Sequence, residues 1–160
     1  MLSPRYRPTS QLLRHGRRLI DQHGLAMVEL TCGVRSSALR CAWSGGRLVL
    51  LAPAPTELTR RLGEALDEVG VVRIQSGRFA AGSSQDWLRV DLVGWVSRVP
   101  QHVQRAAAME FGNRHPTTDL LDLGVGWTLL TVDVAEATVR DGVRQAVLDA
   151  DSAGAWLASA

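Results

Sequence analysis

The sequence predicts an α+β fold in which about six mainly antiparallel strands curl into a small barrel with flanking helices. Apolar and polar residues alternate over short segments separated by turn residues, which is the pattern of strands with one buried face. Helical periodicity is found in a few unevenly spaced segments, which argues against repeated strand–helix–strand units. A chain of 160 residues is also long enough for one domain with its own hydrophobic core.

Three segments are expected along the chain. Residues 1–9 form a basic N-terminal arm rich in proline and arginine, residues 10–150 form the single barrel domain, and residues 151–160 form a weakly patterned tail that we expect to fray. A first helix is predicted from Ser10 to about Gln22, because Ser10 can cap it and a glycine follows its end.

The first three strands are expected to form a meander at residues 25–31, 37–43 and 47–52. The segment Ser44-Gly45-Gly46 predicts the hairpin between the second and the third strand. Arg40 falls in the middle of the second strand, on the face opposite its apolar side chains.

The rest of the domain is expected to alternate helices with longer strands. A second helix, capped by Thr56, should run to about residue 69, and a third helix should begin after Pro100 and end at Gly112-Asn113. Gly94 indicates a bulge or a close backbone approach. The remaining strands are expected at residues 71–76, 87–99 and 127–134, a loop at residues 77–85, and a final short helix at residues 139–150.

The chain has 18 basic side chains, and all of them are arginine. This bias is typical of a GC-rich genome, but it also excludes lysine Schiff bases, lysine nucleophiles and a Walker phosphate loop. Any phosphate or carboxylate that is bound by charge must therefore be bound by arginine, whose planar fork suits it.

Neither the basic arm nor the standard motifs identify an activity. Five arginines precede the first acidic residue, yet no basic stripe or recognition motif follows, so we do not expect nucleic acid as a partner. No nucleophile elbow, zinc-protease motif or dinucleotide fingerprint is present, no metal site is expected, and catalytic residues are unknown. No apolar run approaches the length of a membrane span or signal peptide, so we expect a cytoplasmic protein and no membrane partner.

One group of residues has the chemistry of an anion site. The predicted second helix offers free backbone N–H groups, two hydroxyls and two guanidinium groups at its start. Arg40 could converge on that start from the neighbouring strand. The candidate binding residues are Arg40, Thr56, Thr59, Arg60 and Arg61. The alternative is that Thr56 only caps the helix, the two arginines are solvated, and Arg40 pairs with an acid such as Glu29.

The segment from Gly24 to Leu66 resembles the opening of the FMN-binding split-barrel proteins, which include pyridoxamine-phosphate-oxidase-like flavoproteins and haem-utilisation proteins. The resemblance rests on the helix, the LA-x-V strand, a strand with an arginine, an apolar strand and a helix with T-R-x-L near its start. It extends through the long strand, the following helix and the closing strand, over roughly residues 10–138.

The resemblance implies a homodimer of six-stranded split β-barrels with FMN, a deazaflavin or haem in the cleft between subunits. Its phosphate ligands would fall on Arg40 and on the start of the second helix. Many flavin-binding members carry lysine or histidine where this chain has Leu58, and no histidine follows His115. A non-catalytic interaction or regulatory module that has lost its cofactor is therefore the alternative to an oxidoreductase.

Five tryptophans are present, and four of them lie on predicted strands. They suit a core, a dimer interface or stacking on a cofactor ring. We expect Trp43 and Trp95 to be buried, and Cys32 and Cys41 to be small buried apolar residues.

Overall fold

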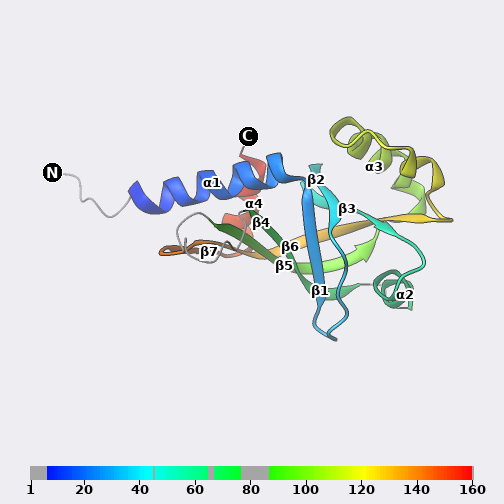
Figure 1. Ribbon diagram of the computed structural model, residues 1–160, viewed down its shortest axis with the longest axis horizontal. Helices are drawn as coiled ribbons and strands as arrows, with labels where there is room; N and C mark the ends of the chain where they lie inside the picture. Colours follow the sequence, from blue (N-terminus) through cyan, green and yellow to red (C-terminus); the bar gives the residue numbers. More distant parts are fainter. Residues whose placement is uncertain (1–6, 45, 65–66, 77–86, 160) are drawn as a thin grey trace.

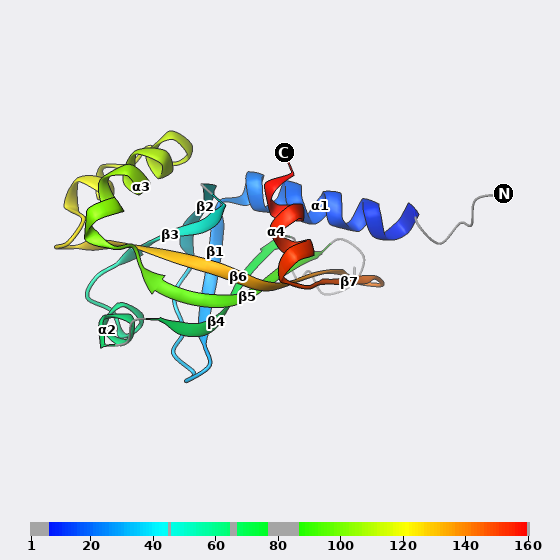
Figure 2. The same cartoon turned by 180° about the vertical axis from the view of Figure 1, so that it is seen from behind.

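The computed structural model describes residues 7–44, 46–64, 67–76 and 87–159. Within them, Figures 1 and 2 show strands gathered into one curved sheet with helices around it. The elements in chain order are α1 (Arg7–His23), β1 (Leu25–Leu30), β2 (Leu39–Ser44), β3 (Arg47–Pro53), α2 (Glu57–Glu64), β4 (Glu68–Ser76), β5 (Leu88–Arg98), α3 (Gln101–Arg114), the short 3-10 helix η1 (Thr118–Asp122), β6 (Trp127–Asp141), β7 (Gln145–Leu148) and α4 (Ala150–Ala158).

The sheet closes into an antiparallel barrel of six strands, as the sequence predicts. The strand order is β3-β2-β1-β4-β5-β6, and pairing between β3 and β6 joins the two ends. The seventh strand, β7, adds only to the far end of β6. The described residues thus form an α+β fold in which closure pairs the edge strands, which would otherwise expose backbone hydrogen-bonding groups.

β6 runs to Asp141, beyond the end predicted at residue 134, because a bulge interrupts its alternation there. Val93 pairs with Glu136 and Gly94 with Val134, so β6 has one extra residue at this point. The inward side chains of β6 are therefore even-numbered before the bulge and odd-numbered after it, which ends the simple alternation near residue 134. A Cβ on Gly94 would lie 2.1 Å from the carbonyl oxygen of Asp133, so the predicted close backbone approach is confirmed.

The main core lies inside the barrel and under three of the helices. It contains inward residues of all six barrel strands, together with Leu12, Leu19 and Ile20 of α1, Leu58 and Leu62 of α2, and Ala153 and Leu157 of α4. Figures 1 and 2 show α1 and α4 together on one side of the barrel and α2 away from them.

The two ends of the chain differ from the expectation. Helix α1 already includes Arg7–Thr9, which were assigned to the arm. The tail that we expected to fray is α4, which packs into the core. The indole Nε1 of Trp156 donates to the Leu13 carbonyl at 3.0 Å, and Arg17 Nε donates to the Leu157 carbonyl at 3.0 Å. These bonds join α4 to α1.

Other predicted boundaries also need correction. Residues 139–150 do not form a helix, because β6 runs to Asp141 and β7 follows. Helix α2 ends at Glu64 and Val69 belongs to β4, while α3 continues through Gly112-Asn113 to Arg114. The predicted left-handed residue after α1 is confirmed, since Gly24 has φ +65°. The predicted loop at residues 77–85 and Gly45 of the predicted hairpin lie outside the described residues.

The barrel has two contrasting outer faces, which we call the covered face and the open face. On the covered face, Phe111 of α3 packs on outward residues of β2, β3 and β6, namely Ala42, Val49, Leu51 and Leu129. On the open face, formed by β1, β4 and β5, Met27 and Trp95 stay about half exposed. The predicted burial of Trp95 is therefore wrong, whereas Trp43 is partly buried against the main core.

Candidate functional site

Arg40 lies on β2 as predicted, but its partners come from distant segments. Its Nη2 donates to Asp119 Oδ2 of η1 at 2.6 Å, and its guanidinium lies 6.0 Å from the ring centre of Trp127. Glu29, the acid named as an alternative partner, pairs instead with Arg35 at 3.0 Å. The charge of Arg40 is thus balanced within the chain.

Thr56 and Thr59 bond to each other at the start of α2. The Thr59 amide donates to Thr56 Oγ1 at 3.2 Å, and the Thr56 amide donates to Thr59 Oγ1 at 2.8 Å. Thr59 is fully buried, and the guanidinium of Arg98 donates to its carbonyl. These hydroxyls therefore act as helix caps, as the alternative interpretation expects for Thr56.

Arg60 and Arg61 lie on a shared hollow of about 370 Å³, together with Cys32, Val34 and Glu57. We call it the α2 hollow. Arg61 Nε donates to Glu68 Oε1 at 2.5 Å, whereas Arg60 is exposed and has no ion pair with the described residues. Among the described residues, the structure brings Arg60 and Arg61 together, but no hydrogen bond or ion pair joins them to Arg40.

The predicted cradle thus fits a phosphate-bearing cofactor only in part. Arg60 and Arg61 offer guanidinium groups at an open surface, although Glu57 beside them opposes an anion. Arg40 is paired with Asp119, a residue that sequence reasoning missed. The two lie 79 positions apart, so no local pattern could have linked them.

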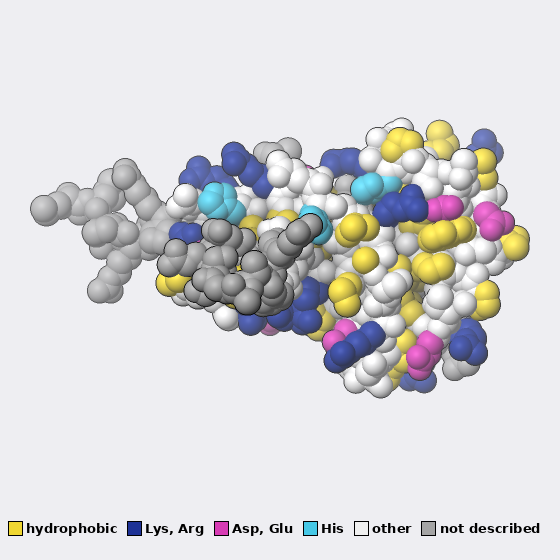
Figure 3. Space-filling view, in the orientation of Figure 1, with side chains coloured by type: hydrophobic (Ala, Val, Ile, Leu, Met, Phe, Trp, Pro, Cys, Tyr) yellow, Lys and Arg dark blue, Asp and Glu magenta, His cyan; other side chains and the backbone are white. Residues whose placement is uncertain are grey.

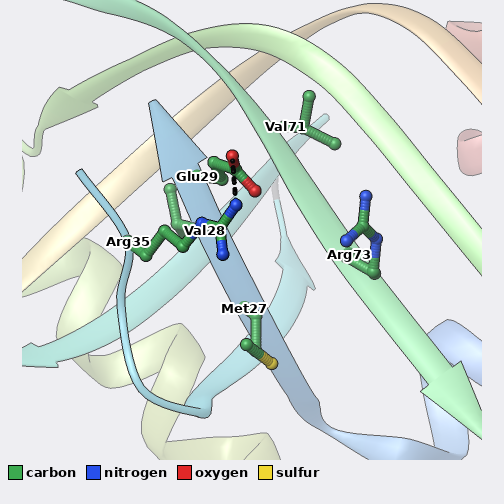
Figure 4. A pocket seen from close by; sticks show the side chains of 6 residues that line it. All are labelled: Met27, Val28, Glu29, Arg35, Val71 and Arg73. Carbon is green, nitrogen blue, oxygen red and sulfur yellow. Dashed lines mark hydrogen bonds and ion pairs between the residues drawn. The ribbon is translucent and has the colours of Figure 1, made fainter. Parts of the chain in front are cut away.

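A second hollow, of about 110 Å³, lies on the open face, and we call it the β1 hollow. Figure 4 shows Met27 and Glu29 of β1, Arg35 of the connection to β2, and Val71 and Arg73 of β4 around it. Val28 is its remaining lining residue. This site is not among the sequence-based predictions, although the alternation within residues 25–31 and 71–76 places these side chains on one face.

The two arginines of the β1 hollow are held by neighbouring carboxylates. Arg35 pairs with Glu29, and Arg73 Nε donates to Asp91 Oδ1 at 2.8 Å. Burial alone would raise the pKa of Asp91, but hydrogen bonds and the charges of Arg89 and Arg73 outweigh it and hold the pKa below its ordinary value. The site thus has fixed guanidinium groups beside the apolar side chains of Met27 and Val71.

The two cysteines have opposite environments. Cys41 is buried, which raises the pKa of its thiol to about 12, so it is an inert core residue. Cys32 is exposed on the α2 hollow, so the expectation that both are buried is wrong for Cys32.

Among the described residues, no group of three or more histidine, cysteine and acidic side chains is arranged to hold a metal ion. Over the same residues, no helix has the length and apolar character needed to cross a membrane.

No protein-family model matches the sequence, and no curated protein matches it. Solved structures do match. A haem-binding protein from Mycobacterium smegmatis superposes with a TM-score of 0.64 at 16% identity, covering 87% of this chain and 59% of the other. A stress-protein-26-related protein of the pyridoxinephosphate oxidase family from Clostridium acetobutylicum gives 0.61 at 14% identity, covering 88% of this chain and 96% of the other.

An FAD- and haem-binding protein from Mycobacterium smegmatis gives 0.59 at 15% identity, with 85% of this chain and 80% of the other covered. The chain has the split-barrel fold. At these identities the likeness shows the fold alone, and the chain spans about three fifths of the haem-binding neighbour. The predicted resemblance to pyridoxamine-phosphate-oxidase-like and haem-binding split barrels is confirmed at that level.

Proposed function

We propose that this split barrel is a homodimer that binds a flavin- or haem-type cofactor between its subunits, on the open face. The observation that carries the proposal is the β1 hollow, where apolar side chains lie beside the guanidinium groups of Arg35 and Arg73. A planar ring with acidic substituents needs this combination, because the ring requires apolar contact and the acidic groups require cations.

The size of the hollow supports a dimeric site. Its volume of about 110 Å³ is far below the roughly 300–1,000 Å³ of ligand pockets, so one subunit encloses only part of a cofactor. Met27 and Trp95 remain 51% and 49% exposed on the same face. Figure 3 shows hydrophobic side chains among arginines on the side of the molecule where β1 lies. A second copy would cover these side chains and complete the site.

The α2 hollow is the second part of the proposed site. The turn between β1 and β2 separates the two hollows, since Cys32 and Val34 line one and Arg35 lines the other. Arg60 and Arg61 are proposed to bind a phosphate or carboxylate of the same ligand. The redox chemistry would belong to the cofactor, and these residues would orient it and balance its charge.

We also propose that the protein acts in the cytoplasm. Both cysteines are free thiols, which suits a reducing compartment.

One observation favours a second candidate, a split-barrel interaction or regulatory module that has lost its cofactor. The Arg40–Asp119 pair and the Thr56–Thr59 bonds use the groups that the predicted phosphate cradle needs. In this alternative, the open face binds another protein subunit and no cofactor.

Visible absorption separates the two candidates. The purified protein is titrated with FMN and with haemin, while sedimentation follows its oligomeric state. The cofactor proposal expects a flavin or Soret band that saturates at one equivalent per subunit of a dimer. A dimer with no spectral change for either ligand would establish the second candidate, and a monomer without binding would contradict both.

Matched arginine variants locate the site. Arg35→Gln and Arg60→Gln each remove one guanidinium from an exposed position in the two hollows, and Arg105→Gln makes the same change on the exposed surface of α3. We expect about tenfold weaker cofactor binding for the first two, since hydrogen bonds to charged groups contribute roughly 1.5–3 kcal/mol. Equal binding by all three variants would show that the cofactor binds elsewhere.

A further inference from the structure

Strand register places three arginines around one carboxylate on the outside of β4, β5 and β6. Arg89 pairs with Arg140 in the sheet, and Arg73 pairs with Asp91. Val90 and Val139, the neighbours of Arg89 and Arg140, are fully buried, so the two arginines face outward. We call Arg73, Arg89 and Arg140 the arginine cluster.

Asp91 balances only two of these charges. Its Oδ1 accepts from Arg73 Nε at 2.8 Å, and its Oδ2 accepts from Arg89 Nε at 2.8 Å and lies 2.7 Å from Arg89 Nη2. Both oxygens are therefore engaged, while each guanidinium carries five N–H groups. The donors of the arginine cluster greatly outnumber the acceptors of this carboxylate.

Arg140 is the member that the carboxylate leaves unpaired. Its Nε is buried and has no hydrogen-bond partner among the described residues, and it makes no ion pair with them. A buried charged donor without an acceptor costs free energy, and two arginines directly opposite on neighbouring strands repel each other. Both costs fall if an anion lies between Arg89 and Arg140.

We propose that the arginine cluster binds a phosphate group, as the free ion or as a monoester. A tetrahedral oxyanion has oxygens on several sides, so it can accept from Arg140 and from the N–H groups of Arg89 that Asp91 does not use. Gln75 and Gln145 flank the two arginines in the same row, and their amides are uncharged donors beside the anion. Arg89 and Arg140 line neither the β1 hollow nor the α2 hollow, whereas Arg73 also lines the β1 hollow. A substitution at Arg140 therefore tests phosphate binding without changing a residue of the proposed cofactor site.

The test is calorimetric titration with inorganic phosphate and with phenyl phosphate at constant ionic strength. Arg140→Gln removes the unpaired guanidinium and leaves the Asp91 pairs in place. Arg105→Gln is the control, because it changes the net charge equally at an exposed position on α3. We expect saturable binding to the wild type, about tenfold weaker binding to Arg140→Gln, and unchanged binding to Arg105→Gln. Binding of both ligands indicates a site for free or esterified phosphate, and binding of inorganic phosphate alone indicates the free ion.

Three results would overturn the proposal. They are no saturable phosphate binding to the wild type, equal binding by Arg140→Gln and the wild type, or weaker self-association of Arg140→Gln without any phosphate effect. The last result would mean that carboxylates of a second subunit pair with Arg140. Circular dichroism checks that the variant folds, which we expect because the substitution removes a buried unpaired Nε. Phosphate binding without a flavin or haem spectrum would support this site and contradict the cofactor proposal.

Discussion

The covered and open faces of the same barrel are completed in different ways. On the covered face, α3 lays Phe111 over outward aliphatic residues of β2, β3 and β6, and water is excluded. On the open face, Met27 and Trp95 remain half exposed, and the ion pair Arg73–Asp91 lies beside Met27 in the sheet. The chain thus supplies its own cover for one face, while the other keeps apolar and charged side chains exposed beside each other.

The largest effect should come from removing the cover. Phe111→Ala deletes a fully buried ring, and we expect a loss of about 3–5 kcal/mol in the free energy of unfolding. Met109→Ala changes an exposed residue of the same helix and should cost less than about 0.5 kcal/mol. Urea denaturation measures both. Equal losses would mean that the packing of α3 on the barrel does not stabilise the fold.

On the open face, charge pairing should stabilise the fold in a pH-dependent way. The pKa of Asp91 is lowered in the folded state, so its contribution is present above the ordinary pKa of about 3.9 and is lost as pH falls through the folded pKa. Asp91→Asn should therefore cost roughly 1.5–3 kcal/mol at pH 7, and progressively less in acid. Urea denaturation at pH 7 and below pH 4 measures the difference between the variant and the wild type. A difference that does not shrink in acid would contradict the ion-pair explanation.

On the open face, strand alternation predicts the position of Trp95 correctly, whereas the expectation that Trp95 is buried is wrong. Trp95 shares its parity along β5 with Arg89 and Asp91, so alternation alone places it outward. The even-numbered residues Val90, Leu92 and Val96 of β5 lie together in the core, as alternation requires. The irregularity expected at Gly94 is present, although the extra residue belongs to β6 opposite it. The local patterns of the two faces also differ, because Val49 under α3 lies in the continuous apolar run of residues 48–52, whereas Val93 on the open face shares its side of β5 with Arg89 and Asp91. A continuous apolar run is typical of a strand that is buried on both faces.

Features that depend on distant segments were not predictable from local patterns. The partner of Arg40 comes from η1, and α4 packs Ala153 and Leu157 into the main core, which is formed by segments far from it in the sequence. The end of β6 was missed since one bulged residue reverses which side chains face inward. Arg60 and Arg61 were correctly placed together because they are neighbours in one helix.

If a second copy covers the open face, Trp95 should be a central contact. Trp95→Glu places a charge on that surface, and we expect a dimer dissociation constant about 30-fold higher, as for loss of an interface hot spot worth about 2 kcal/mol. Sedimentation velocity over a range of concentrations measures it. The exposed Leu121→Glu, on η1, is the control, with no expected change. Equal dissociation constants for both variants would place the interface elsewhere.

The smallest expected effect compares one substitution on the two faces. Val49→Thr places a hydroxyl under α3, where Val49 is buried. It should lower the free energy of unfolding by about 1–3 kcal/mol, because the hydroxyl loses its hydrogen bonds to water and gains none in the protein. Val93→Thr on the open face should change the unfolding free energy of the monomer by less than about 0.5 kcal/mol, since water reaches this half-buried residue. Repeating both measurements at concentrations where the dimer forms sharpens the comparison. If a second subunit covers Val93, the cost of Val93→Thr should rise toward that of Val49→Thr, whereas a concentration-independent cost would mean that the open face stays in water.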